Sequence, residues 1–204
     1  CEDFEYTPVI FKAFQRAGLQ VGLGGNIGYS FAELVATENP PYYVLEISSF
    51  QLDGIEHFAP HIAVLLNITP DHLDRYDYKF ENYINSKFRI AMNQTENDYL
   101  IYDADDEVIT QWLSTHTIKS KLIPFSIEKE LPQGAFLKDN KIYIMLENQT
   151  TEIDVEEISL RGKHNIKNTM AASVAARLVN IRNNSLRESL KGFKGAPHRL
   201  EEVK

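Results

Sequence analysis

The sequence predicts an α/β fold: a mostly parallel sheet flanked by helices, with a small antiparallel region at one edge. Two near-continuous apolar runs, residues 42–48 and 61–69, have the length and the branched or aromatic side chains of strands covered on both faces. Strand-like and helix-like segments alternate along most of the chain, which is typical of βαβ units. Between residues 121 and 160, short strand-like segments with turn residues replace this alternation and predict the antiparallel edge.

The first part of the chain contains an expected helix, a strand and a second helix. The pair "TP" before "VIFKAF" is a helix-start pattern, and the apolar residues that follow predict a helix over 8–17. "LQVGLGGNIG" predicts a short strand that runs into a glycine-rich loop. Ser30 and Glu33 have the spacing of a capping box, which predicts that "FAELVATE" is helical.

After the two apolar runs the elements keep alternating. Residues 79–92 have helical periodicity, "NDYLIYDAD" has the pattern of a strand and "DDEVITQWL" that of a helix. In the edge region, Asp139 and Asn140 precede a strand-like run and predict a hairpin turn. Apolar residues recur every four positions over 166–178, which predicts a long helix, and a shorter one is expected near 185–191.

Composition and charge exclude several classes of protein. The 204 residues are 43% hydrophobic and 25% charged, enough to bury a core. The net charge is -8 and the basic residues are scattered, which argues against a nucleic-acid or membrane surface. The acidic start "CEDFEY" is unlike a secretory leader, and one cysteine cannot form an internal disulfide. We expect a cytoplasmic protein and, from the abrupt ends, a piece of something longer.

Two predicted strands end in polar residues that suit a ligand site. Glu46 lies near the end of the first apolar run, and Asn67 to His72 follow the second. Ligands of open α/β sheets bind beyond the carboxyl ends of the strands, where a carboxylate and an imidazole together can hold a metal ion. The alternative for each residue alone is a salt-bridged glutamate and a surface histidine. Their coincidence favours a metal site.

Lys87 falls within an apolar stripe of the helix expected over 79–92. At about 100° per residue it shares a face with Phe80, Ile84 and Ala91. An ammonium group in such a place reaches the rim of the apolar surface or meets an anion. A chemically modified lysine is the third alternative, since a desolvated amine loses its proton and becomes nucleophilic.

A glycine-rich segment and a pair of asparagines can each be explained either by a functional role or by a purely structural one. "GLGGNIG", residues 22–28, could cradle a phosphate with backbone N–H groups, but glycine loops often only turn the chain, and it matches neither common phosphate-binding glycine pattern. Asn165 and Asn168 lie three residues apart near the start of a predicted helix. Their amides either cap that helix or read the edge of a base, and capping is the simpler interpretation.

Six motifs resemble, in their order and approximate spacing, those of the ATP-dependent Mur ligases of peptidoglycan synthesis. They are "GGNIG", "LEISSFQL", "NITPDHLDRY", "NSKFRI", "LRGKHNIKN" and "GAPHRLE", and the resemblance covers nearly the whole chain. Within the family, "LEISSFQL", "NITPDHLDRY" and "APHRLE" look most like the members that add D-glutamate to UDP-N-acetylmuramoyl-L-alanine. Related ligases, including folylpolyglutamate synthetase, have different residues at these places.

The resemblance implies a central ATP-binding domain with a P-loop-NTPase-like fold over residues 1–197 and the start of a linker over 198–204. The parent enzyme would phosphorylate the alanyl carboxylate with ATP, and the amine of D-glutamate would attack the resulting acyl phosphate. Two Mg²⁺ ions would neutralise charge on the phosphoryl group and the acceptor carboxylate, and Mn²⁺ could substitute because one expected ligand is an imidazole. The parent is expected to be a monomer that acts on small molecules.

The resemblance also implies roles for single residues. Glu46, His72 and Lys87 would hold the metal ions, and His72 and Lys87 would be catalytic. His72 would also face the alanyl carboxylate of the substrate. Lys87 would be carbamylated, so that its added carboxylate holds the second ion, and this modification would explain a lysine within an apolar stripe.

Five further residues would contact the substrates. Asn26 and Ser48 would bind the UDP-muramoyl substrate. Asn165 and Asn168 would flank the adenine of ATP, and Arg199 would meet the nucleotide at the hinge to the next domain.

One part of the family pattern is not found. The phosphate-binding loop G-T-[NA]-G-K-[ST] belongs just before the helix expected over 8–17, where this chain has "CEDFEY", whose acidic groups would repel a triphosphate. The flanking domains that would grip the uridine diphosphate and D-glutamate are not found either, so we expect the 204-residue chain alone to be inactive. Two alternatives stay open: a non-catalytic α/β binding module and a ligase of the same superfamily that adds another amino acid.

Overall fold

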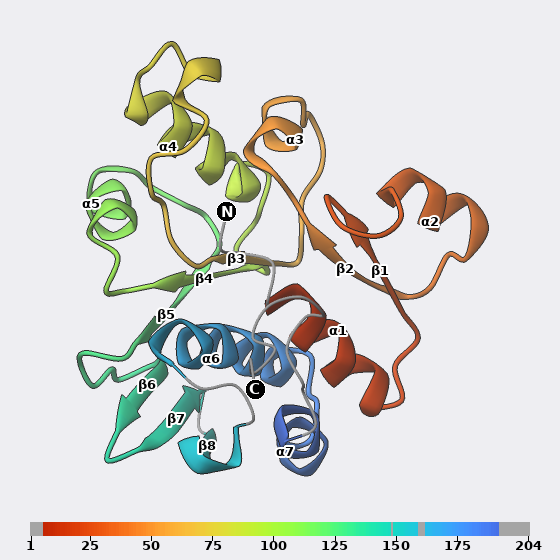
Figure 1. Ribbon diagram of the computed structural model, residues 1–204, viewed down its shortest axis with the longest axis vertical. Helices are drawn as coiled ribbons and strands as arrows, with labels where there is room; N and C mark the ends of the chain where they lie inside the picture. Colours follow the sequence, from red (N-terminus) through yellow and green to blue (C-terminus); the bar gives the residue numbers. More distant parts are fainter. Residues whose placement is uncertain (1–5, 148, 159–161, 192–204) are drawn as a thin grey trace, which may run out of the picture.

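The computed structural model describes residues 6–147, 149–158 and 162–191. Its strands form a two-stranded parallel sheet, β1–β2, and a six-stranded sheet in the order β3-β4-β5-β6-β7-β8. The row of parallel strands crosses the molecule between helices α3, α4 and α5 on one side and α1 and α6 on the other (Figure 1). The mostly parallel α/β fold predicted from the sequence is confirmed.

The elements follow one another in the predicted alternation. The strands are β1 (Val21–Gly25), β2 (Tyr42–Glu46), β3 (Ile62–Leu65), β4 (Tyr99–Asp103), β5 (Lys121–Ser126), β6 (Gly134–Lys138), β7 (Lys141–Leu146) and β8 (Gln149–Asp154). The α-helices are α1 (Tyr6–Arg16), α2 (Phe31–Thr37), α3 (Ser49–Asp53), α4 (Phe80–Phe88), α5 (Glu107–Thr115), α6 (Lys163–Leu178) and α7 (Asn183–Lys191). Short 3₁₀ helices are η2 (Leu73–Arg75), η3 (Arg89–Ala91) and η4 (Val155–Glu157).

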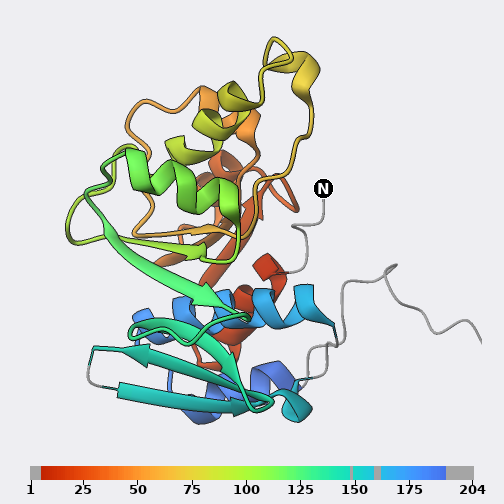
Figure 2. The same cartoon turned by 90° about the vertical axis from the view of Figure 1, so that its left-hand side faces the viewer.

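The antiparallel edge consists of β6, β7 and β8. The strands β3 to β6 pair in parallel, whereas β6 pairs with β7 and β7 with β8 in antiparallel register. Asp139 and Asn140 form the turn between β6 and β7 with φ angles of 48° and 60°, the left-handed pair that a two-residue hairpin requires. The three strands lie at the end of the molecule away from α4 (Figure 2), and the predicted hairpin region is confirmed.

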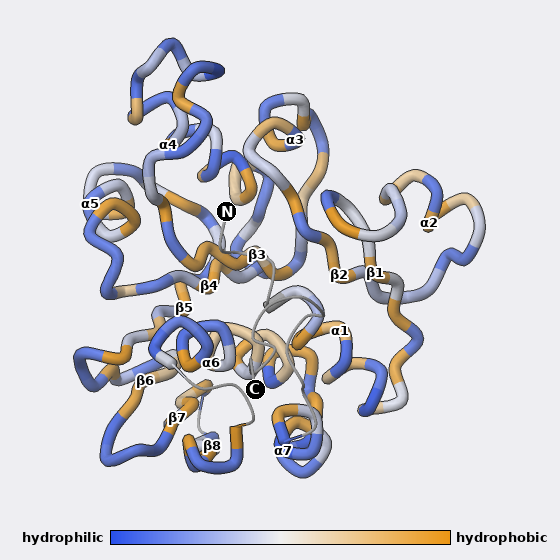
Figure 3. The backbone as a smooth tube through the Cα atoms, viewed as in Figure 1, coloured by the Kyte–Doolittle hydropathy of each residue, from blue (hydrophilic) through white to orange (hydrophobic). Residues whose placement is uncertain are grey.

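The near-continuous apolar runs arise because the parallel strands are buried on both faces. Leu100 of β4 packs with helices α4 and α5, whereas its neighbour Ile101 packs with α1 and α6. The strands are accordingly hydrophobic along their length and the outer loops hydrophilic (Figure 3). Among the described residues, no helix is both long and apolar enough to cross a bilayer.

Three local expectations need correction. The helix expected over 79–92 is α-helical only to Phe88 and then tightens into the 3₁₀ turn η3. The strand expected over 61–69 pairs only from Ile62 to Leu65. The short helix α3 was not predicted, although Ser48 and Gln51 have the S-x-x-Q spacing of a capping box and form one in the structure.

Asp106 joins α5 to the loop after β3, and its loss is expected to destabilise the fold. Its Oδ1 accepts the N–H of Ile109 at 2.9 Å and so caps α5, while its Oδ2 accepts the N–H of buried Ile68 at 3.0 Å. Asp106→Ala is expected to cost about 2–3 kcal/mol in urea unfolding, because a cap and a buried hydrogen bond are both lost. Ser30→Ala, which removes only the cap of α2, should cost about 1 kcal/mol; equal losses would contradict the second role of Asp106.

Candidate active site

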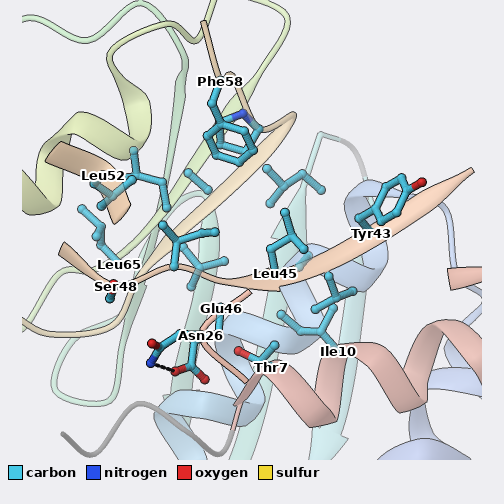
Figure 4. Close-up of a pocket in the computed structure, with 18 of the residues that line it drawn as sticks. Thr7, Ile10, Asn26, Tyr43, Leu45, Glu46, Ser48, Leu52, Phe58 and Leu65 are labelled. Carbon is cyan, nitrogen blue, oxygen red and sulfur yellow. Dashed lines mark hydrogen bonds between the residues drawn. The ribbon is translucent and has the colours of Figure 1, made fainter. Parts of the chain in front are cut away.

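A cavity of about 660 Å³ lies between β2 and β3. Its walls come from residues 41–50 and 60–67, with contributions from α1 and α4. Apolar side chains form most of the lining, and Asn26 and Glu46 lie at one end of it, away from Tyr43 and Phe58 (Figure 4). Other polar lining residues include Thr7, Ser48, Asn67, His72 and Lys87. Five of the residues expected to form the site are therefore brought to a single cavity.

Glu46 is a buried carboxylate with a defined amide partner. It ends β2, is 7% exposed and accepts a hydrogen bond from Asn26 Nδ2 at its Oε1, 3.1 Å away (Figure 4). The backbone N–H of Asn26 donates to the Glu46 carbonyl at 2.7 Å, so two hydrogen bonds join these residues. A buried carboxylate would be costly without such a partner, and this pairing orients one oxygen of Glu46.

The glycine-rich stretch makes that pairing sterically possible. Gly25 has φ of 102°, and a Cβ there would lie 2.2 Å from the Glu46 carbonyl oxygen. Its N–H donates to the Tyr29 carbonyl at 2.9 Å, and that of Asn26 is bonded to Glu46. The N–H groups of Gly25 and Asn26 are thus both bonded to carbonyl groups of this chain. Glycine is needed at position 25 because the backbone turns and passes close to Glu46, which agrees with the structural explanation of this stretch.

His72 lines the same cavity from the loop after β3. It has a left-handed backbone, with φ of 49°, and such strain in a non-glycine residue tends to mark functional positions. Its ring centroid lies 5.2 Å from that of Phe50, and its Nε2 lies 3.5 Å from Asp71 Oδ2. With 52% of its side chain exposed, His72 is accessible to a ligand.

Lys87 enters the cavity wall from the last turn of α4. It is partly buried, and its Nζ lies 5.6 Å from the centroid of the Tyr83 ring, an aromatic contact that suits a cation. Its expected apolar neighbours Phe80 and Ile84 are partly buried and Ala91 is buried. The residues expected to share its face are thus buried or partly buried, although Ala91 lies in η3 and not in α4.

Ser48 has a structural partner that the sequence interpretation did not consider. Its Oγ accepts the N–H of Gln51 at 3.3 Å, and its own N–H donates to Gln51 Oε1 at 2.9 Å. It lines the cavity as well, so its expected contact with substrate stays a prediction.

Asn165 and Asn168 are not among the residues that line this cavity. They lie in the first two turns of α6 and are 7% and 8% exposed. Lys167 between them forms ion pairs at the end of β4, with Nζ 2.6 Å from Asp103 Oδ2 and 3.4 Å from Asp105 Oδ2. Sequence reasoning missed these pairs. Arg199 and the linker expected over residues 198–204 lie outside the described residues.

The ion pairs of Lys167 shift two pKa values. Burial raises the pKa of the Asp103 carboxyl, and the hydrogen bond from Lys167 lowers it by less. Partial burial lowers the pKa of the Lys167 ammonium, but the hydrogen bond and charge of Asp103, together with Asp105, raise it by more. Burial therefore outweighs the ion pair at Asp103, whereas the two carboxylates keep the pKa of Lys167 above its usual value.

The cavity offers a donor set that fits a divalent cation. Among the described residues no three His, Cys, Asp or Glu side chains cluster as metal ligands. Mg²⁺, however, is commonly held by one or two carboxylates together with water and substrate phosphates. Glu46 is a buried carboxylate in the cavity wall whose orientation Asn26 fixes, and the imidazole of His72, which lines the same cavity, would be a nitrogen donor.

Comparison with known proteins identifies the relatives of this chain. The family profile described as the Mur ligase middle domain matches residues 15–176. The UDP-N-acetylmuramoylalanine–D-glutamate ligase of Christiangramia forsetii is 54% identical over 97% of this chain and 44% of its own length. That of Bacteroides fragilis is 47% identical with the same coverage. The chain therefore spans less than half the length of these relatives.

Solved structures support the same fold at low sequence identity. A UDP-N-acetylmuramoyl-L-alanyl-D-glutamate–2,6-diaminopimelate ligase aligns over 96% of this chain and 45% of its own, with a TM-score of 0.73 and 16% identity. A pseudomurein peptide ligase type C from Methanothermus fervidus aligns over 98% and 49%, with a TM-score of 0.68 and 18% identity. At these identities the likeness concerns the fold alone.

Proposed function

Because the chain belongs to the Mur ligase family, we propose that it is the central domain of an ATP-dependent ligase that adds D-glutamate to UDP-N-acetylmuramoyl-L-alanine. One observation carries the chemical part of this assignment: Asn26, Glu46, His72 and Lys87, which come from four segments of the chain, line one cavity. The 54% identity to a D-glutamate-adding enzyme favours this amino acid over those added by other members of the superfamily. We place the reaction in the cytoplasm, where ATP is available.

The proposed reaction forms an amide bond in two steps. The alanyl carboxylate of the muramoyl substrate attacks the γ-phosphorus of ATP, which releases ADP and gives an acyl phosphate. The amine of D-glutamate then attacks the acyl carbon and expels phosphate, while the amine gives up a proton. Binding of Mg²⁺ would supply charge neutralisation during phosphoryl transfer.

Each cavity residue has a role in this proposal. Glu46 would hold the cation through the carboxylate that Asn26 orients, and His72 would hold it and face the alanyl carboxylate. Lys87, once carbamylated, would contribute a second carboxylate from an apolar wall. Asn26 and Ser48 would bind the muramoyl substrate beside this position.

The adenine contact is a separate part of the proposal. Asn165 and Asn168 would flank the adenine of ATP at the start of α6, and Arg199 would meet the nucleotide. The Lys167 ion pairs hold this turn of α6 against the carboxyl end of β4, where ligands of α/β sheets bind.

Mn²⁺ titration followed by electron paramagnetic resonance tests the cation site directly. We expect the 204-residue chain to bind Mn²⁺ and Glu46→Gln to weaken binding at least about 10-fold, because the replacement removes the buried charged ligand. Asn26→Ala should weaken it about 10-fold by releasing the carboxylate. Glu56→Gln removes the same charge from an exposed position and should change nothing. Equal effects of the two glutamate variants would disprove the assigned site.

A further inference from the structure

A hydroxyl network, formed by Tyr76, Ser86, Ser49 and Asp53, joins three segments beside the cavity. Tyr76 Oη donates to Asp53 Oδ2 at 3.1 Å and lies 3.2 Å from Ser86 Oγ. The single hydroxyl proton of Ser86 has two acceptors within reach, Asp53 Oδ1 at 2.7 Å and the Ser49 carbonyl oxygen at 3.0 Å. Tyr76, Ser86 and Ser49 are buried, at 7%, 4% and 4% exposed, so the hydroxyls would be costly to leave without partners.

The proton count makes this network specific. Tyr76 and Ser86 supply two hydroxyl protons, and the two carboxylate oxygens of Asp53 each have one of these hydroxyls within hydrogen-bond distance. Hydrogen bonds to a carboxylate are stronger than neutral ones, so Asp53 holds both hydroxyls in place. Loss of either hydroxyl leaves one oxygen of Asp53 without its donor from the network.

A second set of hydrogen bonds joins the C-terminal end of α3 to Arg89. Arg89, just beyond α4, donates from Nε to the Leu52 carbonyl at 2.7 Å and from Nη2 to the Ile55 carbonyl at 2.9 Å. These carbonyls lie at the C-terminal end of α3, where a cation is favourable. Hydrogen bonds from Ser86 to residues at both ends of α3, and from Arg89 to its C-terminal end, thus join α3 and the end of α4 into one unit.

Each candidate cation-binding residue is adjacent to this unit. Glu46 lies two residues before the N-cap of α3. The ring of His72 packs on that of Phe50 of α3, with centroids 5.2 Å apart. In the sequence, His72 precedes Tyr76 by four residues. Lys87 follows Ser86 directly on α4. The network therefore connects the backbones that carry all three residues.

We propose that Tyr76 and Ser86 are positioning residues that set the relative placement of Glu46, His72 and Lys87, an inference that rests on the proposed function. Neither hydroxyl is assigned as a ligand of the cation; each would act through the segment to which it is bonded. Because supporting groups around a metal ligand typically contribute 10–100-fold in affinity, Tyr76→Phe and Ser86→Ala are each expected to weaken Mn²⁺ binding about 10-fold.

The experiment titrates Mn²⁺ into the 204-residue chain and its variants, with urea unfolding of each. Ser86→Thr keeps the hydroxyl and should restore affinity to within about 3-fold of the unaltered chain if its extra methyl is accommodated. Ser189→Ala is the matched control, since Ser189 is also buried and its Oγ donates to the Ser185 carbonyl at 2.7 Å, on α7. All titrations are made at a temperature at which every variant is folded, so that a change in Mn²⁺ affinity is not caused by unfolding.

The outcomes separate this inference from the function on which it rests. Weaker Mn²⁺ binding by Tyr76→Phe and Ser86→Ala, but not by Ser189→Ala, supports positioning. Lower stability of the two variants with unchanged affinity overturns it, because a purely structural network has that effect. If the unaltered chain and Glu46→Gln bind Mn²⁺ equally, the cation site itself fails and the positioning role falls with it.

Discussion

Gly25→Ala is expected to destabilise the protein by about 2–6 kcal/mol, because a left-handed backbone and an overpacked contact each cost roughly 1–3 kcal/mol. The added Cβ would lie 2.2 Å from the Glu46 carbonyl oxygen, and φ at this position is 102°. Neither the backbone of β2 nor that of the loop can yield without breaking the bond from the Asn26 N–H to Glu46. Urea unfolding measures the loss, and Mn²⁺ affinity should fall with it.

Gly28→Ala is the matched control for this prediction. Gly28 belongs to the same loop and has a positive φ of 69°, but its nearest atom to a new Cβ, the Leu23 carbonyl oxygen, is 3.5 Å away. This variant should therefore show only the backbone cost, about 1–2 kcal/mol. If the two variants lose the same stability, the close approach of Gly25 to Glu46 is not what requires glycine.

The fold was predictable because its determinants are local and periodic. Leu100 and Ile101 face opposite cores, and that arrangement appears in the sequence as an uninterrupted apolar run. Asp139 and Asn140 predict the hairpin turn because Asp and Asn tolerate a left-handed backbone. The helix α3 was missed because five residues give too little periodicity, although the Ser48–Gln51 spacing marks its start.

The candidate site was only partly predictable, because its partners are distant in sequence. The position of Glu46 at a strand end indicated a buried carboxylate, but no spacing rule connects it to Asn26, twenty residues earlier. The Tyr76–Asp53 and Lys167–Asp103 pairs likewise span 23 and 64 residues. Such pairs are determined by the packing of helices on the sheet, so they require coordinates.

Lys167→Met is expected to cost about 3–5 kcal/mol in urea unfolding at neutral pH, because it leaves buried Asp103 without its cation. The side chain of Asp103 is 4% exposed and that of Asp105 is 3% exposed, so water cannot replace the ammonium group. Lys141 is the matched control: it also lies between two carboxylates, Glu152 and Asp154, each at 3.7 Å, but on the surface. Lys141→Met should cost about 0–1 kcal/mol.

The stability difference between the unaltered chain and Lys167→Met should also depend on pH. The pKa of Lys167 is raised in the folded state above its usual 10.5, so its stabilisation is complete below that value and disappears as pH rises through the folded pKa. Partial burial raises the pKa of Tyr102 too, but Tyr102 is present in both proteins and cancels in the difference. The difference should therefore shrink in strongly alkaline solution.

A second substitution tests whether the uncompensated charge is the cause. The double variant Lys167→Met with Asp103→Asn removes the buried carboxylate that has lost its cation, so it should be more stable than Lys167→Met alone. Because Asn165 and Asn168 flank Lys167 on α6, hydrogen exchange at the start of this helix should rise in the single variant and recover in the double. A double variant no more stable than the single one would mean that an uncompensated charge on Asp103 is not the cause of the loss.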